Sequence, residues 1–434
     1  LVKEDYLPRQ TQLAKIEYQG INIDQSYREW GDRALDNTIT ATTAKIFELC
    51  GEKFPLNSPK KLANYLFHEG VGYKHPDPEL AEQIARENPE TVRYVGGRIM
   101  YRSQHYTVKG QMQTGEAVLK SLVTRYKCPL ANLLMSLKKA DKAKNSFFKN
   151  IGILSNMFED GRIHPGYNIT GTSTGRLSSS SGVDGVGFNN QNIIKGLIGA
   201  LRDMRGNLVL GPDGKPVFEG VKCKKLFIPD DDSYCFGNAD AKGAEVSIFA
   251  GYAKDAALIN ALLEGMDAHC FFASQCLNPA LVAAGLHGED RRIALANAAI
   301  DDDHAWSYDD FLKGKDDLLE DKAYGKRLKA LRDNIKRLVF GLLFGAGVKK
   351  IADIAGINLE LAQQIKKLLF TKFPTLEAFI NQAIWEMRTF GIVETYHGRR
   401  RRFSLGKYAP NALRAKAERQ AVNFKIQGTN SDIV

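Results

Sequence analysis

The sequence contains no apolar run of about 18 residues, the length that a transmembrane helix needs, and its first residues lack the pattern of a signal peptide. Its 6 cysteines form no Cys-x-x-Cys pair, the spacing that is typical of zinc and redox sites. We therefore expect reduced thiols, a cytoplasmic location and no membrane partner. The content of 44% hydrophobic and 25% charged residues is ordinary for a soluble globular protein.

Positive charge, in contrast, is in excess: the formal net charge is +10 at pH 7, which favours a polyanionic partner. The excess is clustered. Seven Lys or Arg residues and no acid lie between Thr395 and Ala417. A second cluster, opposed only by Asp141, consists of Lys138, Lys139, Lys142, Lys144 and Lys149. Solvated faces would have the same composition, whereas phosphate contacts would make binding weaken steeply with salt.

One segment combines cations and aromatic rings at a helical spacing. Arg332, Lys336, Phe340 and Phe344 recur every four residues, so on a helix they form one slowly turning stripe with an axial length of roughly 18 Å. We call these four residues the cation–aromatic stripe. The two cations suit a polyphosphate and the two rings suit a flat base. The stripe alone leaves open an amphipathic helix whose basic edge reaches into solvent.

Five further motifs accompany the stripe in a fixed order. Before it come Thr-Ser-Thr-Gly-Arg at 172–176, Asn-Gln-Asn-Ile at 190–193, Gly-Asn-Ala-Asp-Ala-Lys-Gly-Ala-Glu at 237–245 and Glu-Gly-Met-Asp-Ala-His at 264–269, and after it comes Glu-Arg-Gln-Ala-Val-Asn-Phe-Lys-Ile-Gln-Gly-Thr at 418–429. The series resembles the polymerase domain of family A DNA polymerases, the group of bacterial DNA polymerase I. The sequences of its motifs are most similar to those of the phage replicative DNA polymerases, and the resemblance runs from about residue 10 to the end.

The resemblance implies an α+β fold of the right-hand polymerase type, with a helical thumb, a palm of antiparallel sheet and helices, and helical fingers. The expected parts are an entry helix and the edge of the palm at 1–40, the thumb at 41–160, the palm at 161–251, the fingers at 252–390 and further palm at 391–434. Ser58 followed by Pro59 predicts a helix start within the thumb.

Two insertions are expected within this frame. Pro-Asp-Gly-Lys at 212–215, between apolar runs, predicts a hairpin in an insertion at about 197–220. An acidic insertion is expected at about 289–321, and nine acids lie in its second part, 301–321. Crowded carboxylates beside a lysine-bearing helix favour a solvated loop there, with a metal site as the alternative.

The resemblance also implies an activity. It is the template-directed addition of deoxynucleoside monophosphates to a primer 3′-end, with two Mg²⁺ ions for which Mn²⁺ could substitute. Two divalent cations about 4 Å apart can stabilise both the attacking and the leaving oxygens of a phosphoryl transfer. The implied partners are primer–template DNA, deoxynucleoside triphosphates (dNTPs), and a processivity factor or other replisome proteins in a bacterial or phage-infected cell.

Two carboxylates in the third motif have implied roles. Asp240, which we expect to end an apolar strand at 234–239, matches the family's metal-bridging aspartate, and the carbonyl of Ala241 would be a further ligand. The alternative is an aspartate that caps the next helix. Glu245 matches the carboxylate that crowds a ribose 2′-hydroxyl, which would favour DNA over RNA synthesis. The alternative for Glu245 is an exposed helix glutamate.

The stripe and the fourth motif match the residues that hold the incoming nucleotide. His269, Arg332 and Lys336 match the positions that hold the triphosphate, and Lys336 is also a candidate proton donor to pyrophosphate. Phe340 matches the ring that packs against deoxyribose and base, and as phenylalanine it implies discrimination against dideoxynucleotides. Phe344 stands where the family usually has tyrosine, so stacking is kept but a hydroxyl hydrogen bond is lost.

Contacts to DNA are implied in four places. Arg176 matches the arginine that reads the minor-groove edge at the primer terminus. The other expected DNA contacts are Gln191, Asn192, Arg419, Asn423, Gln427, Lys138, Lys139 and Lys142. The spacing of four puts three of them, at 419, 423 and 427, on one helical face, which without the resemblance could be plain surface.

One departure from the family pattern concerns the second catalytic aspartate. In the family it lies in a His-Asp-Glu hairpin tens of residues after Gln-Gly-Thr, whereas this sequence ends at Val434. Asp432 matches the ordinary acid of the Gln-Gly-Thr-x-x-Asp segment. Either the natural protein continues, or the chain is catalytically impaired and acts only as a primer–template DNA-binding module.

Overall fold

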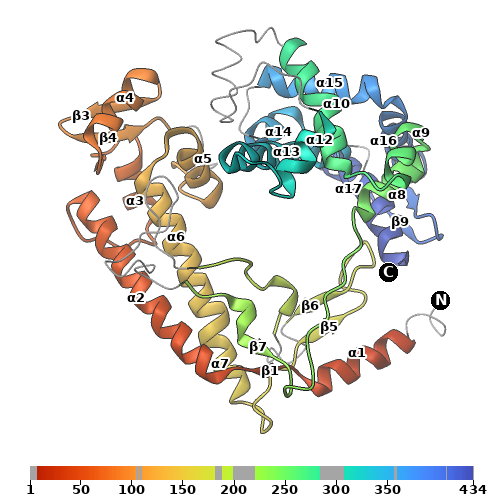
Figure 1. Cartoon of the computed structure of the whole chain (residues 1–434), viewed down its shortest axis with the longest axis horizontal. Coiled ribbons are helices and arrows are strands. Elements are labelled where there is room, and N and C mark those ends of the chain that lie inside the picture. The colour runs from red at the N-terminus through yellow and green to blue at the C-terminus, as the bar shows by residue number, and fades with distance from the viewer. Residues whose placement is uncertain are drawn as a thin grey trace. The chain divides into compact units, whose positions relative to one another are not determined.

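A computed structural model gives the fold and describes residues 7–103, 106, 110–180, 188–198, 220–283, 307–355, 359–406 and 408–433. The chain divides into two compact units, and most of their helices and strands are labelled in Figure 1. Unit 1 consists of Leu1–Asn168 and Ser178–Gly237, and unit 2 of Ile169–Leu177 and Asn238–Val434. No helix among the described residues has the length and apolar character to cross a membrane.

Unit 1 is mainly helical. Its α-helices are α1 (Leu7–Gln19), α2 (Gln25–Cys50), α3 (Pro59–Leu66), α4 (Pro78–Glu87), α5 (Glu116–Tyr126), α6 (Pro129–Ala143) and α7 (Asn150–Ser155). A π-helical turn, Lys144–Lys149, joins α6 to α7. The predicted helix start at Ser58 is confirmed, because its side chain accepts from the Lys61 N–H and Pro59 occupies the first turn of α3.

The strands of unit 1 are short and antiparallel. β2 (Tyr73–Lys74), β3 (Val92–Val95) and β4 (Arg98–Tyr101) form one sheet in the order β2-β4-β3. β1 (Asn22–Ile23) pairs with β7 (Phe227–Ile228), and β5 (Gly166–Asn168) pairs with β6 (Ser178–Ser180). The 3₁₀-helices are η3 (Asn190–Asn192) and η4 (Cys223–Leu226). Two apolar cores stabilise the unit, one around Tyr73 and Tyr101 and one around Leu35 and Phe148.

Unit 2 has nine labelled α-helices within its described residues. They are α8 (Ala244–Ala253), α9 (Ala256–Leu263), α10 (Ala268–Ala283), α12 (Tyr308–Lys315), α13 (Lys322–Leu343), α14 (Val348–Ala355), α15 (Leu359–Lys372), α16 (Pro374–Phe390) and α17 (Asn411–Ile433). A hairpin of β8 (Ile392–Glu394) and β9 (Arg400–Arg402) precedes α17. The largest apolar core of the unit joins side chains of α8, α10, α12, α13, α15 and α16, and α13 packs against α10, α12 and α14.

The acidic insertion differs from the prediction in its described part. Residues 289–306 lie outside the described residues, and Tyr308–Lys315 form helix α12 where a solvated loop was expected. That expectation was wrong for this stretch because Ser307 and Asp310 form a reciprocal capping box, and because Phe311 is fully buried against the core of unit 2. The hairpin predicted at about 197–220 lies almost entirely outside the described residues, although Ile198 and Val221 beside it pair through two backbone hydrogen bonds.

The strand predicted at 234–239 is not present, and this is a second correction. Residues 234–241 form neither helix nor strand, and the Tyr234 and Phe236 side chains are 65% and 63% exposed. A strand needs a neighbour to accept its N–H groups, and no described strand pairs with this segment. The boundary between the two units falls within it, at Gly237.

Candidate functional site

The cation–aromatic stripe lies on α13, as the sequence predicts. Arg332, Lys336 and Phe340 are within the helix, and Phe344 follows its last residue, where Gly345 adopts a φ of 74°. The Phe340 and Phe344 rings stack with their centroids 5.9 Å apart at an interplanar angle of 24°. Both residues are partly exposed, and aromatic rings of this kind can stack on a planar ligand.

The N-terminus of α10 faces the stripe. The His269 ring lies 5.2 Å from the Phe340 ring, centroid to centroid. Asp267, just before the helix, accepts the backbone N–H groups of His269 and Cys270, each at 3.0 Å. These bonds satisfy two of the free donors of the first turn and fix the place of the histidine. The fourth motif and the stripe are therefore brought together within unit 2.

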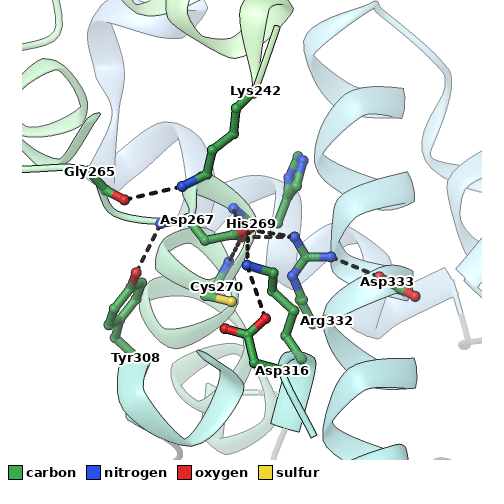
Figure 2. Close-up of polar contacts among 10 residues, drawn as sticks. Lys242, Gly265, Asp267, His269, Cys270, Tyr308, Asp316, Arg332 and Asp333 are labelled. Carbon is green, nitrogen blue, oxygen red and sulfur yellow. Dashed lines mark hydrogen bonds and ion pairs between the residues drawn. The ribbon is translucent and has the colours of Figure 1, made fainter. Parts of the chain in front are cut away.

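An ion pair between Asp267 and Arg332 joins α10 to α13 (Figure 2). The Nη2 atom of Arg332 donates to Oδ1 and Oδ2 of Asp267 at 2.9 and 2.8 Å, and its Nη1 atom donates to Asp333 at 2.9 Å. The Arg332 and Asp267 side chains are 10% and 9% exposed, respectively. Charge-assisted bonds of this kind are strong when water is excluded. Arg332 is therefore held in place by carboxylates rather than free in solvent.

Two buried polar atoms near this pair have no hydrogen-bond partner among the described residues. They are Nε of Arg332 and Nδ1 of His269. Buried polar groups normally find partners, so such atoms are suited to meet a ligand or ordered water. Both belong to residues that the sequence assigned to the triphosphate.

The pKa shifts in this cluster reflect crowding of positive charge. Burial lowers the pKa of His269, and the neighbouring cations Lys336 and Arg332 lower it further, to about 4. Burial alone would raise the pKa of Asp267, but hydrogen bonds from the Cys270 backbone and from Arg332 hold it well below its ordinary value. Near pH 7 the site thus contains a neutral imidazole and an ionised carboxylate, while Lys336 is exposed one helical turn from Arg332. Such a cluster favours an anionic ligand.

Asp240 and Ala241 lie in the exposed segment before α8. Lys242, two residues on, donates to the Gly265 carbonyl at 3.4 Å, which brings this segment beside the turn that precedes Asp267 (Figure 2). Asp240 does not cap α8, because the N-cap residue of that helix is Gly243, so that alternative is wrong. Among the described residues, no three His, Cys, Asp or Glu side chains are grouped so as to hold a metal ion.

Glu245, in the first turn of α8, forms an ion pair with Arg176. The Nη2 atom of Arg176 donates to Oε1 of Glu245 at 2.6 Å, with the side chains 42% and 25% exposed. Glu245 is therefore partly buried and paired, in contrast to the exposed helix glutamate of the alternative. Arg176 belongs to Ile169–Leu177, the short segment that groups with unit 2. Two residues with separate predicted roles are in direct contact.

The segment that carries Arg176 rests on a further ion pair. Gly175 has a φ of 77°, and a Cβ there would lie 2.5 Å from the Arg399 guanidinium, so only glycine fits without displacing that side chain. Arg399 in turn donates from Nε to Asp432 at 2.7 Å, and the Thr395 hydroxyl donates to the same carboxylate at 2.7 Å. Asp432, for which the sequence analysis predicted no site role, therefore supports the segment that holds Arg176.

The helical face predicted on α17 is present. Arg419 is exposed, while Asn423 and Gln427 are partly buried on the same helix. The Arg419 side chain lies beside Gly345, since a Cβ on that glycine would meet its Cγ at 3.1 Å. This contact brings the start of the α17 face to the aromatic end of the stripe. The buried Oδ1 of Asn423 has no hydrogen-bond partner among the described residues.

The remaining predicted DNA contacts belong to unit 1 and are exposed. Gln191 and Asn192 lie on η3. Lys138, Lys139 and Lys142 lie on α6, where Lys138 donates to the Thr114 carbonyl at 3.3 Å.

Comparison with known proteins identifies the family. The chain matches the family model for DNA polymerase family A over residues 27–296 and 319–434. It belongs to DNA polymerase family A. The family inferred from the ordered motifs is therefore confirmed, and so is the mixed α and β polymerase fold.

Individual relatives agree with this assignment. The chain is 27% identical to DNA polymerase I of Chloroflexus aurantiacus over 429 residues, which is 99% of the chain and 35% of the relative. It is 25% identical to the thermostable DNA polymerase I of Thermus aquaticus over 434 residues, 100% of the chain and 40% of the relative. The chain therefore spans well under half of the length of these relatives.

A solved structure is also similar in fold. It is the POL domain of Pol1 from M. smegmatis, in complex with DNA primer–template and dNTP. The TM-score is 0.64 and the identity 24%, over 99% of this chain and 58% of that one.

Several residues of the site were missed by the sequence analysis. Asp267 lay within a quoted motif, but its bond to Arg332 joins residues 65 positions apart. Lys315 and Tyr308 of α12 also contact Asp267, and they come from the stretch predicted to be a solvated loop. Phe311, an apolar residue among acids, was a signal that this stretch packs against the core.

Proposed function

We propose that the chain is the polymerase part of a DNA-directed DNA polymerase, which adds deoxynucleoside monophosphates to a primer 3′-end. In this reaction the 3′-oxygen attacks the α-phosphate of a dNTP and pyrophosphate leaves. Family membership supports the chemistry. The observation that carries the proposal is the grouping of His269, Arg332, Lys336 and Phe340 where α10 meets α13.

The nucleotide would lie along the stripe. Lys336 and the free Nε of Arg332 would meet the triphosphate, His269 would donate or accept at its free Nδ1, and Lys336 could give a proton to the leaving pyrophosphate. Phe340 and Phe344 would stack on the sugar and base. Glu245 would crowd a ribose 2′-hydroxyl, and its bond to Arg176 supports this role because it fixes the carboxylate.

Two divalent cations, Mg²⁺ or Mn²⁺, belong to this proposal. When bound, they would stabilise the charge on the attacking and leaving oxygens. The Asp240 carboxylate and the Ala241 carbonyl are hard oxygen ligands of the right kind, and they are exposed. Among the described residues, Asp240 belongs to no group of three or more His, Cys, Asp or Glu side chains that could hold a metal ion. One carboxylate suits the chemistry but is too few for two ions.

DNA binding and the division into parts extend the proposal. Unit 1 would include the thumb at 41–160, whose exposed α6 lysines would contact phosphates, and η3 would add Gln191 and Asn192. Unit 2 would include the fingers at 252–390, with Arg176, Arg419, Asn423 and Gln427 on the DNA side. A role in replication, a cytoplasmic location and a processivity factor are also part of the proposal.

A second candidate function is a primer–template DNA-binding module without catalysis. It is favoured because, among the described residues, no group of three potential metal-binding side chains surrounds Asp240. In this case the basic surfaces would still bind DNA through counterion release, and affinity would fall steeply with salt.

Single-nucleotide extension with this chain, Mg²⁺ and a primer–template separates the two candidates. Incorporation of the complementary nucleotide supports the polymerase. No incorporation together with salt-dependent DNA binding supports the module, and the absence of both refutes the two proposals.

The measurement of DNA binding can compare two double variants that remove the same charge from different helices. Replacing Lys139 and Lys142 with alanine should lower the slope of log affinity against log salt by about 2. Replacing Lys366 and Lys367, exposed lysines of α15, removes the same charge from another helix and serves as the control. An equal change in both pairs would mean that α6 makes no particular phosphate contact.

A further inference from the structure

Helix α12 lies outside the part of the chain that matches the family. The two matched stretches, 27–296 and 319–434, leave residues 297–318 between them, and α12 is Tyr308–Lys315. The helix is nevertheless integrated in unit 2. Its Phe311 is fully buried, and α12 packs against both α10 and α13. An added segment is therefore placed against the two helices that form the nucleotide site.

Both ends of α12 contact Asp267. At the N-terminal end, the hydroxyl of Tyr308 accepts the Asp267 backbone N–H at 2.9 Å. At the C-terminal end, Nζ of Lys315 lies 3.4 Å from Asp267 Oδ2 and 3.5 Å from Asp316 Oδ1. Figure 2 shows the Tyr308 hydroxyl near the Asp267 backbone N–H and the Arg332 guanidinium beside the Asp267 carboxylate. Asp267 thus has two cationic partners, one from α13 and one from α12.

The pairing of Asp267 with two cations matters because this carboxylate is buried. Its side chain is 9% exposed, whereas that of Lys315 is 28% exposed. A buried carboxylate that loses its cation is strongly destabilised, since neither water nor another charge compensates it. If Arg332 turned toward a phosphate, Asp267 would be left in that state unless a second cation remained. Lys315 is the cation in position to remain.

We propose that Lys315 is a positioning residue of the nucleotide site, which retains Asp267 as its partner so that Arg332 can turn its guanidinium to the triphosphate. This inference rests on the proposed function. It gives α12 a role beyond packing: the added helix supplies a third cation to a site whose other cations come from α13.

Burial alone would lower the pKa of Lys315, but the attraction of Asp267 and Asp316 raises it above its ordinary value, so the amine stays charged. Lys313 of the same helix is exposed and provides a matched control. Phe311 is left unchanged in every variant, which keeps the packing of α12.

The test compares dNTP binding by Lys315→Ala, Lys315→Arg and Lys313→Ala in the presence of primer–template and Mg²⁺. Binding is followed by displacement of a fluorescent dNTP analogue, and KM and kcat are measured where extension occurs. Lys315→Ala should weaken dNTP binding about fivefold and raise KM to the same extent, while kcat changes less than twofold. Lys315→Arg should restore binding, and Lys313→Ala should match the parent.

A double variant decides whether Asp267 carries the effect. In an Asp267→Asn background the carboxylate charge is absent, so Lys315→Ala should cause no further loss of dNTP binding. Equal losses in both backgrounds, or unchanged binding by Lys315→Ala alone, would overturn the role of Lys315 and leave the polymerase proposal intact. If the parent chain itself binds no dNTP, the proposed function fails and this inference fails with it.

Discussion

The guanidinium of Arg176 donates a 2.6 Å hydrogen bond to the Glu245 carboxylate. The first residue is proposed to read the primer terminus and the second to crowd the nucleotide sugar. Their bond couples the two tasks, because a shift of the 169–177 segment would move the carboxylate as well. Sugar selection should therefore depend on both residues, and to different extents.

Glu245→Ala should admit ribonucleotides. Removing the carboxylate opens space for a 2′-hydroxyl, and we expect the preference for dNTP over rNTP, as a ratio of kcat/KM, to fall about 100-fold. Arg176→Ala should lower the preference about tenfold, because Glu245 stays but is no longer fixed. Ser247→Ala, on the exposed side of the same helix, is the control. A parent that already uses rNTPs as well as dNTPs would contradict the role of Glu245.

Lys336→Ala should reduce turnover far more than DNA affinity. The ammonium is exposed and has no hydrogen-bond or ion-pair partner within the part of the chain that the structure describes. Its proposed contact forms only with the triphosphate and the leaving pyrophosphate. We expect kcat to fall about 100-fold or more, with the dissociation constant for primer–template within twofold of the parent. Arg337→Ala removes a charge from the next position and should leave both quantities near the parent. Equal losses in turnover and DNA binding would refute the triphosphate role.

His269 should make stability depend on pH. Its pKa is lowered to about 4 in the folded chain, below the ordinary value of about 6.5. Between these values the unfolded chain binds a proton that the folded chain does not, so the free energy of unfolding falls as the pH falls. The slope of the unfolding free energy with pH approaches about 1.4 kcal/mol per pH unit. Over the whole interval the unfolding free energy falls by about 3 kcal/mol.

Denaturant unfolding between pH 7 and pH 4.5 measures this effect. His269→Gln should flatten the decline, whereas His397→Gln, an exposed histidine of the same unit, should not. A bound triphosphate should also raise the pKa of His269, which NMR titration of its ring protons would detect. A histidine that titrates near pH 6.5 without ligand would contradict the crowding of cations around it.

Much of the site could be predicted from order and spacing along the chain. The four-residue period of the stripe predicted α13, and the motif order predicted the family. Contacts between distant residues could not be predicted in this way. Arg332 bonds Asp267 from a turn 65 positions earlier, and Asp267 also pairs with Lys315 of an added helix. No local pattern encodes either contact.

The two errors have a common physical origin. The run at 234–239 has the apolar character of a strand, but strand formation depends on a neighbour that the local sequence does not specify. The stretch around α12 has the composition of a solvated loop, yet one capping box and one buried phenylalanine were sufficient to form a packed helix. In both cases tertiary surroundings outweighed composition.

Asp432 should prove structural rather than catalytic. Its carboxylate is 8% exposed and accepts from both Arg399 and Thr395, so Asp432→Asn would leave the arginine without its counter-charge. We expect a loss of about 3 kcal/mol in unfolding free energy. Arg399→Ala should cost a similar amount, and the double variant should cost less than the sum, because the two residues share one interaction.

The distinguishing measurement is the response to metal. If Asp432 only supports the segment of Arg176, Asp432→Asn should leave the Mg²⁺ concentration for half-maximal extension within twofold of the parent. Asp240→Asn should abolish extension at every Mg²⁺ concentration, because the proposed metal position would lose its carboxylate. A large rise in the Mg²⁺ requirement of Asp432→Asn, without loss of stability, would instead make Asp432 a metal ligand and would remove the structural explanation of its burial.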